Sequence, residues 1–320
     1  HSDGLLTDFP FIYPVYYFAM SLNAWIHAAR LRTLPLATAS TLCGCLLAAL
    51  QQSLHWPTAI LTIATAVALQ IFSNLANDYG DAQNGADSAG RQGPPRMVAA
   101  GHISRHTMQK GLAISAGLCC LLGIALLATA LPALAQSSGK DWLVWLLLGA
   151  TALAAAYGYT AGRKPYGYIG FGDAAVFVFF GWLAVLGSEY LHTGRLNTDS
   201  WLPASAMGLW CTMVLNLNNM RDIEHDWISG KRTLAARLGL PRAKHYHRAL
   251  AVMAAVCWSV WLARYFHGFS WLVLQVFMLA ATFVHLNLLN NTSSSFELDK
   301  LLPQWSITVL AWVMVLALFI

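Results

Sequence analysis

Charged residues are scarce in this chain. Asp, Glu, Lys and Arg make up only 10% of its 320 residues, whereas an ordinary soluble domain carries about 25%. Hydrophobic residues make up 57%, in long runs that recur along nearly the whole chain. A soluble domain needs more polar side chains than this to cover its surface, so the composition excludes a soluble globular protein.

The long apolar runs predict an all-α membrane protein with nine transmembrane helices. A helix needs about 20 mostly apolar residues to cross the hydrocarbon core of a bilayer. The predicted spans are 33–50, 57–77, 107–136, 142–160, 173–192, 201–219, 245–263, 270–290 and 303–320. A polar motif follows the second and the sixth span, which suggests two duplicated sets of four helices plus one extra helix.

The N-terminal residues are set apart from this bundle. Residues 1–19 contain no methionine, and Met20 opens a stretch that reads like a natural start. The apolar patch at 9–20 is too short to span a bilayer and lacks the Lys or Arg of a signal peptide. We therefore expect 1–19 to be an upstream remnant and 20–320 to form a single transmembrane domain.

The basic residues predict the orientation of the protein. Positive residues beside membrane spans stay on the cytoplasmic side. If the first span starts inside, all but three of the 19 Lys and Arg residues fall in cytoplasmic segments, the exceptions being Lys140, Arg195 and Arg264. Both polar motifs then face the cytoplasm. This topology also explains the formal net charge of +5 without a nucleic-acid partner.

Cysteine is sparse too, and its placement argues against a thiolate metal site. All six cysteines fall inside apolar runs. Cys43 and Cys45 are two residues apart and therefore point to different faces of a helix. We expect the cysteines to be small packing residues.

The first polar motif ends the second apolar run. If the helix continues through it, Asn74, Asn77 or Asp78, and Asp81 lie at spacings of three and four and share one face. Carboxylates that are forced together at a membrane edge repel one another. We expect a cation, in the form of a metal bound with its substrate, to relieve that repulsion.

The second polar motif ends the sixth run. Asn218, Asp222 and Asp226 are four residues apart and are predicted to line one helical face. Carboxylate and amide oxygens from two helices suit Mg²⁺, which prefers a few carboxylates plus substrate phosphate. A simpler interpretation is that these are solvated loop residues, but two such motifs, each at the end of an apolar span, favour a site.

Basic and aromatic residues flank the two motifs. Cations can hold phosphate oxygens, and tyrosine rings can line an aromatic pocket or face an allylic cation. Taken singly these residues decide little, because Arg, Lys and Tyr are ordinary near membrane interfaces. The candidate substrate-binding residues are Asn74, Tyr79, Arg91, Arg96, Arg163, Lys164, Arg221 and Lys231, and Tyr157 is a candidate catalytic residue.

The two motifs together resemble the aspartate-rich motifs of the UbiA superfamily of intramembrane aromatic prenyltransferases. Segments 30–35, 73–81, 163–173 and 218–234 most resemble the branch that prenylates 1,4-dihydroxy-2-naphthoate for menaquinone biosynthesis. The general family pattern has a third acid four residues beyond Asp81. This chain has Gly85 there and Asp87 two residues later, a shift that the naphthoate branch shares.

The resemblance implies a nine-helix bundle around a central cavity that opens sideways to lipid. It implies that polyprenyl diphosphate ionises with Mg²⁺ as cofactor, and that 1,4-dihydroxy-2-naphthoate attacks through its carboxyl-bearing carbon. Loss of CO₂ then gives demethylmenaquinone and diphosphate. By the same resemblance the metal ligands are Asn77, Asp81, Asn218, Asp222 and Asp226, and the catalytic residues are Asp78, Asp81, Asp222, Asp226 and Tyr157.

Two other functions fit part of this pattern. A related enzyme could use another aromatic acceptor, such as 4-hydroxybenzoate, although the Gly85 and Asp87 arrangement argues against it. An ion-coupled transporter would instead hold its carboxylates near the middle of the membrane, at broken helices. Here the carboxylates are predicted at helix ends on one side, which favours an enzyme.

Overall fold

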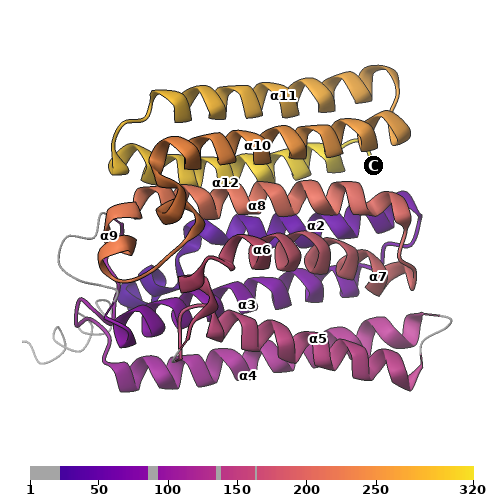
Figure 1. Cartoon of the computed structure of the whole chain (residues 1–320). Helices are drawn as coiled ribbons and strands as arrows, with labels where there is room; N and C mark the ends of the chain where they lie inside the picture. Colours follow the sequence, from indigo (N-terminus) through magenta and orange to yellow (C-terminus); the bar gives the residue numbers. More distant parts are fainter. Residues whose placement is uncertain (1–21, 86–92, 135–137, 163) are drawn as a thin grey trace, which may run out of the picture.

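The computed structural model describes residues 22–85, 93–134, 138–162 and 164–320. Throughout these ranges the regular elements are helical, which confirms the all-α prediction, and they form one bundle (Figure 1). The first helices are α2 (Leu34–Leu50), α3 (Trp56–Gln83), α4 (Arg105–Ala130), α5 (Gly139–Gly158), α6 (Gly172–Val176), the π-helix η4 (Phe177–Leu186) and α7 (Gly187–Thr193). They are followed by α8 (Trp201–Arg221), α9 (Ile223–Ile228), α10 (Leu234–Tyr265), α11 (Gly268–Asn291) and α12 (Ser295–Ala317).

Short elements connect or extend these helices. The 3₁₀-helix η1 (Leu31–Thr33) leads into α2, and η3 (Tyr166–Ile169) lies between α5 and α6. The other two 3₁₀-helices are η2 (Leu131–Ala133) and η5 (Thr198–Ser200). Helix α10 is broken near its start, where Gly239 has a positive φ of 73°.

Eight helical segments of the described chain are long and apolar enough to cross a membrane. The sixth predicted span corresponds to α8, which is not among the eight. Its 21 residues span roughly 30 Å at 1.5 Å per residue, enough to cross, but its last turns carry Asn216, Asn218, Asn219 and Arg221. Because α8 is packed on α10, η4 and α12, protein rather than lipid covers most of it. The count of nine spans therefore stays a prediction.

The helices that carry the two motifs are packed in similar ways. Helix α3 ends in the first motif and packs mainly against α4, whereas α8 ends in the second and packs mainly against α10. Helix α2 lies between these pairs and contacts α3, η4, α7 and α12. Helix α9, which continues the second motif, lies at the left end of the bundle in Figure 1.

Glycines let two backbones meet at the centre of the bundle. A Cβ atom added to Gly181 of η4 would lie 2.6 Å from the carbonyl oxygen of Ala204, and one on Gly208 of α8 would lie 2.7 Å from that of Phe177. Small residues commonly allow such close helix contacts in membranes. The contact fixes η4 against α8, and π-helices such as η4 often occur at functional sites.

Tryptophan fills the other side of α8. Trp210 is buried, and its ring lies 5.3 Å from that of Trp312 and 5.6 Å from that of Trp258. Trp261 and Trp305 extend this buried cluster. Rings of this size bury large apolar areas, so the side of α8 that faces α10 and α12 is solid core. The main cavity lies on the opposite side of α8, towards α2, α3 and α5.

Candidate active site

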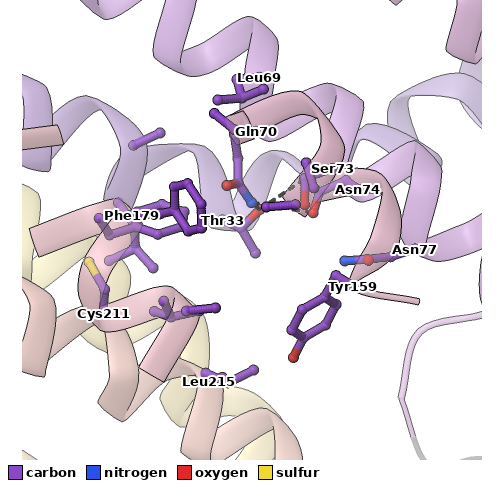
Figure 2. Close-up of a pocket in the computed structure, with 18 of the residues that line it drawn as sticks. Thr33, Leu69, Gln70, Ser73, Asn74, Asn77, Tyr159, Phe179, Cys211 and Leu215 are labelled. Carbon is purple, nitrogen blue, oxygen red and sulfur yellow. Dashed lines mark hydrogen bonds between the residues drawn. The ribbon is translucent and has the colours of Figure 1, made fainter. Parts of the chain in front are cut away.

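A cavity of 360 Å³ connects the two polar motifs with an apolar interior. Its walls come mainly from α2, α3, α5, η3, η4 and α8. Figure 2 shows the ring of Tyr159 projecting into it between Asn77 and Leu215, with Phe179 and Cys211 further across. The volume is in the range of pockets for drug-sized ligands. Five predicted metal ligands line it, namely Asn77, Asp81, Asn218, Asp222 and Asp226.

The helix does continue through Asn74, Asn77 and Asp81, the condition for their sharing one face, because α3 extends to Gln83. Asn74 lines the cavity, and its amide donates to the Thr33 hydroxyl at 3.0 Å (Figure 2). The same amide donates to the backbone carbonyl of Ala29 at 2.8 Å. The side-chain carbonyl oxygen of Asn77 accepts a hydrogen bond from the Thr160 hydroxyl at 3.0 Å. These bonds fasten α3 to the start of α2 and to the segment that follows α5.

Asp81 is the centre of the polar network. It is fully buried, and one carboxylate oxygen lies 2.8 Å from the Lys231 ammonium and accepts a 2.8 Å hydrogen bond from the Tyr168 hydroxyl. The other oxygen is paired with the guanidinium of Arg96. Asp81 thus joins α3 to three other segments of the chain, which carry Arg96, Tyr168 and Lys231.

The second motif differs from the continuous helical face that its spacing predicts. Helix α8 ends at Arg221, and Asp222 joins it to α9 with φ −100° and ψ 12°. Asn218, Asp222 and Asp226 nevertheless all line the cavity, because the Asp226 amide still donates to the Asp222 carbonyl at 2.7 Å. The bend preserves the shared face across two helices.

Arg221, a residue of the second motif, neutralises the charge of the neighbouring Asp222 carboxylate. Its guanidinium donates through Nε to the Asp222 carboxylate at 2.7 Å and through Nη2 to the side-chain carbonyl oxygen of Asn218 at 2.9 Å. Its Nη1 lies 2.5 Å from Asp299 of α12, which also accepts a 2.9 Å hydrogen bond from Arg32. We expected Mg²⁺ with its substrate to relieve the repulsion between the motif carboxylates. In the structure Arg96, Lys231 and Arg221 already do so.

The surroundings of Asp226 disfavour its ionised form. Burial raises the pKa of Asp226 to about 6; the Lys231 ammonium offsets part of that rise, and the Asp222 and Asp81 carboxylates add to it. Its side chain accepts a 3.3 Å hydrogen bond from the Thr233 hydroxyl. A cation bound beside Asp226 would therefore stabilise its charged form.

The donor set of the cavity mouth suits Mg²⁺. Three carboxylates and two amides offer hard oxygen ligands from α3 and from the α8–α9 junction. Within the described ranges, no three Asp, Glu, His or Cys side chains lie close enough to form a metal site by themselves. Mg²⁺ commonly takes one or two protein carboxylates and completes its shell with water and substrate phosphates, so the residues fit.

Some residues predicted for the site lie elsewhere. The Tyr157 side chain, our candidate catalytic residue, is 41% exposed and is absent from the cavity lining, whereas Tyr159, one of the tyrosines that we expected to line an aromatic pocket, projects into it. The helical periodicity separates these two residues by about 200° around α5. The Tyr79 hydroxyl bonds Gln109 at 2.8 Å outside the cavity, and Lys164 is exposed. Arg91, Arg163 and Asp87 lie outside the described residues.

Asp78 has a structural environment rather than the catalytic one that we predicted. Its two carboxylate oxygens accept hydrogen bonds from the backbone amides of Met97 and Val98, each at 2.9 Å. It is buried and does not line the cavity, because it lies about 100° around α3 from Asn77. Asp78 therefore fixes the segment that carries Arg96 against the helix that carries Asp81.

We predict that Asp78→Asn weakens diphosphate binding more than it weakens metal binding. The amide keeps one acceptor but turns an N–H donor towards a backbone amide, so the segment with Arg96 loosens. We expect the KM for a prenyl diphosphate to rise about tenfold, the equivalent of one lost hydrogen bond to a charged group. Steady-state kinetics across a Mg²⁺ titration test this. A large loss of apparent Mg²⁺ affinity with an unchanged KM would instead make Asp78 a metal ligand.

Comparison with known proteins identifies relatives of this chain. A profile of the UbiA prenyltransferase family matches residues 37–302. The 1,4-dihydroxy-2-naphthoate octaprenyltransferase of Escherichia coli is 45% identical over 81% of this chain and 82% of its own length. The enzyme of the same name from Mycobacterium tuberculosis is 39% identical over 74% of this chain and 77% of its own.

Solved structures share the fold at low sequence identity. The apo structure of a UbiA homologue from Aeropyrum pernix matches with a TM-score of 0.64 and 19% identity, over 90% of this chain and 99% of that one. A UbiA homologue from Archaeoglobus fulgidus, bound to GPP and Mg²⁺, matches with a TM-score of 0.58 and 16% identity, over 92% and 99%. Both have the helical fold described above.

Proposed function

The chain belongs to the UbiA prenyltransferase family, and we propose that it transfers a polyprenyl chain from polyprenyl diphosphate to 1,4-dihydroxy-2-naphthoate. The main support for this proposal is that one cavity joins the two carboxylate and amide motifs at its mouth to an apolar, aromatic interior. The mouth suits a metal-bound diphosphate, and the interior suits an allylic chain and an aromatic ring. The 45% identity to the E. coli naphthoate prenyltransferase supports this choice of acceptor.

The residues of the cavity mouth have separate tasks in this reaction. Asn77, Asp81, Asn218, Asp222 and Asp226 would hold Mg²⁺, which supplies charge neutralisation of the leaving diphosphate. Arg96 and Lys231 line the same mouth and donate hydrogen bonds to diphosphate oxygens. Before the substrate binds, Asp81 holds both cations at the mouth of the cavity.

The apolar, aromatic interior of the cavity suits the allylic cation that forms during the reaction. The carbon–oxygen bond to diphosphate breaks with its electron pair on oxygen, leaving an allylic cation near the rings of Tyr159 and Phe179. The naphthoate forms a new bond from its carboxyl-bearing carbon, and the carboxylate leaves as CO₂, which restores the aromatic ring. The product is the reduced, hydroquinone form of demethylmenaquinone. The apolar walls keep water from intercepting the cation.

The reaction can be tested with purified protein. We expect prenyl transfer to 1,4-dihydroxy-2-naphthoate in detergent or vesicles, with release of CO₂ and a strict need for Mg²⁺. Transfer to 4-hydroxybenzoate instead would replace the proposed acceptor with the rival one. Turnover without an ion gradient would argue against a transporter, whose carboxylates are expected near the membrane midplane and not at the helix ends where Asp81 and Asp222 lie.

We predict that product length follows the supplied diphosphate. A cavity of 360 Å³ has room for the reacting groups and a few isoprene units, but not for a chain of eight units beside a naphthoate. The hydroxyls of Thr41, Thr62 and Thr65 along its wall bond the carbonyls of their own helices, so they form no polar stop. The rest of the tail then stays in lipid. Turnover of diphosphates from two to nine isoprene units measures this, and a sharp cutoff within that series would contradict it.

We further propose that this is an integral protein of the bacterial inner membrane whose cavity mouth faces the cytoplasm. The apolar helices support membrane insertion, and the placement of all but three basic residues supports the orientation. Gln83 is exposed at the end of α3 beside the mouth. We expect Gln83→Cys to react with an impermeant thiol reagent only after the membrane is opened, whereas Arg195→Cys reacts in intact cells. The reverse pattern would invert the topology.

A further inference from the structure

The site already contains cations on the oxygens that a metal would use. Lys231 and Arg96 hold the two oxygens of Asp81, and Arg221 holds Asp222 together with the Asn218 carbonyl. All three cationic side chains are at least 85% buried, since the most exposed of them, Lys231, has 15% of its side-chain surface accessible. Buried charges of this kind are stable only while they stay paired.

A metal ion alone therefore meets competition at this site. To ligate Asp81, it must take an oxygen from the Lys231 ammonium or the Arg96 guanidinium. The displaced cation would then lie buried beside a divalent ion and without a carboxylate partner. The free-energy cost of leaving that cation unpaired opposes the binding of the metal. Diphosphate alone meets the converse difficulty, because it must draw the same cations from their carboxylates and approach three Asp side chains.

Joint binding removes both difficulties. The carboxylates turn to the metal, and Lys231 and Arg96 turn to phosphate oxygens, so that every buried charge keeps an opposite partner. We propose that Lys231 and Arg96 act as counter-ions that exchange partners, and that they make the binding of metal and diphosphate mutually dependent at this site. This inference deepens the proposed function and rests on its diphosphate and metal site, but not on the identity of the aromatic acceptor.

In one variant, Lys231→Met, we expect the affinity for the metal to rise and the affinity for diphosphate to fall. Lys231→Met keeps an aliphatic stem of similar length, which can still lie against the Tyr168 ring that the ammonium now contacts at 4.7 Å. It removes the competitor from one Asp81 oxygen, so the metal alone should bind more tightly. It also removes a phosphate ligand, so diphosphate should bind more weakly. A lysine that only stabilises the fold would change neither affinity in this way.

The experiment measures binding without turnover, on the full chain in detergent. Mn²⁺ replaces Mg²⁺ so that free metal can be counted by its paramagnetic signal, and inorganic diphosphate is the second probe. In the unsubstituted protein we expect each ligand to strengthen the binding of the other by about 10–100-fold. In Lys231→Met we expect Mn²⁺ alone to bind about tenfold more tightly, and the mutual strengthening to fall by a similar factor.

Two further variants complete the test. Arg96→Met removes the competitor from the other Asp81 oxygen and should change both affinities in the same directions as Lys231→Met. Lys110→Met is the matched control, because Lys110 is an exposed lysine of α4 outside the cavity lining. It should change neither affinity, which excludes a general effect of net charge. Thermal unfolding confirms that each variant is folded.

Two results would overturn the proposal. If Mn²⁺ binds Lys231→Met and Arg96→Met no more tightly than the unsubstituted protein, the cations do not compete with the metal. Full-strength Mn²⁺ binding in the absence of diphosphate would also contradict it. Failure of the proposed function is a separate outcome, because absence of naphthoate prenylation would leave the coupled binding of metal and diphosphate intact.

Discussion

Asp81→Asn should lower the rate of prenyl transfer roughly 10³-fold, the equivalent of about 4 kcal/mol of transition-state stabilisation. Asn keeps the size and shape of the side chain and removes one negative charge. The metal then loses a carboxylate ligand at the point where the departing diphosphate needs its charge neutralised. Asp222→Asn and Asp226→Asn should cause losses of similar size, because both residues line the same mouth.

The same substitution should also destabilise the protein. Repulsion between the motif carboxylates, taken alone, predicts that removal of one charge stabilises the fold. The structure reverses this expectation, because Asp81 is the buried partner of both Arg96 and Lys231. We expect a loss of about 2 kcal/mol in the free energy of unfolding, less than for a single isolated pair because Asp226 still attracts Lys231.

The measurement is prenyl transfer by purified variants across a Mg²⁺ titration, beside denaturant unfolding. Glu224→Gln is the matched control, since Glu224 lies between Asp222 and Asp226 in the chain but is exposed. It removes the same charge at nearly the same place and should change neither rate nor stability appreciably. Near-normal rates for both Asp81→Asn and Asp226→Asn would refute the two-motif site.

Gly80→Ala should disrupt the site through the backbone. A Cβ atom at Gly80 would lie 2.5 Å from the carbonyl carbon of Thr160 and 2.6 Å from the amide nitrogen of Ala161. These are backbone atoms, so no side-chain rotation relieves the overlap. Helix α3 and the segment after α5 must separate, which should cost about 1–3 kcal/mol.

The separation also has a catalytic effect. The Thr160 hydroxyl bonds Asn77, and Tyr168, a few residues further on, bonds Asp81. A shift at Gly80 moves both predicted metal ligands relative to the second motif. We therefore expect a rate loss of about 10²-fold, because misplacement by 1 Å can cost that much. Gly117→Ala in α4 is the control: nothing lies within 4 Å of its added Cβ, and alanine favours the helix. Equal behaviour of the two variants would refute the close contact.

The motifs were recognisable in the sequence because their chemistry is unusual for a membrane chain. Carboxylates at the ends of apolar spans are costly, so a pair of such motifs predicted a site, and Asn77, Asp81, Asn218, Asp222 and Asp226 do line one cavity. Arg96 and Lys231 were candidates because they are cations close to the two motifs, and both line the cavity. Asp78 does not line this cavity and instead accepts hydrogen bonds from the backbone amides of Met97 and Val98, because spacing along a helix does not show which neighbouring segment a side chain faces.

Apolar run length and motif spacing are local properties of the sequence, and they determined the all-α membrane fold class and the two polar motifs; the resemblance of those motifs to a known family then selected the candidate ligands. The tertiary structure decided the rest. It showed that α8 is enclosed by protein, that Tyr159 rather than Tyr157 enters the cavity, and that protein cations already hold the motif oxygens. These features depend on contacts between residues such as Lys231 and Asp81, far apart in the chain, and the sum of packing and charge pairing across the whole bundle sets such contacts.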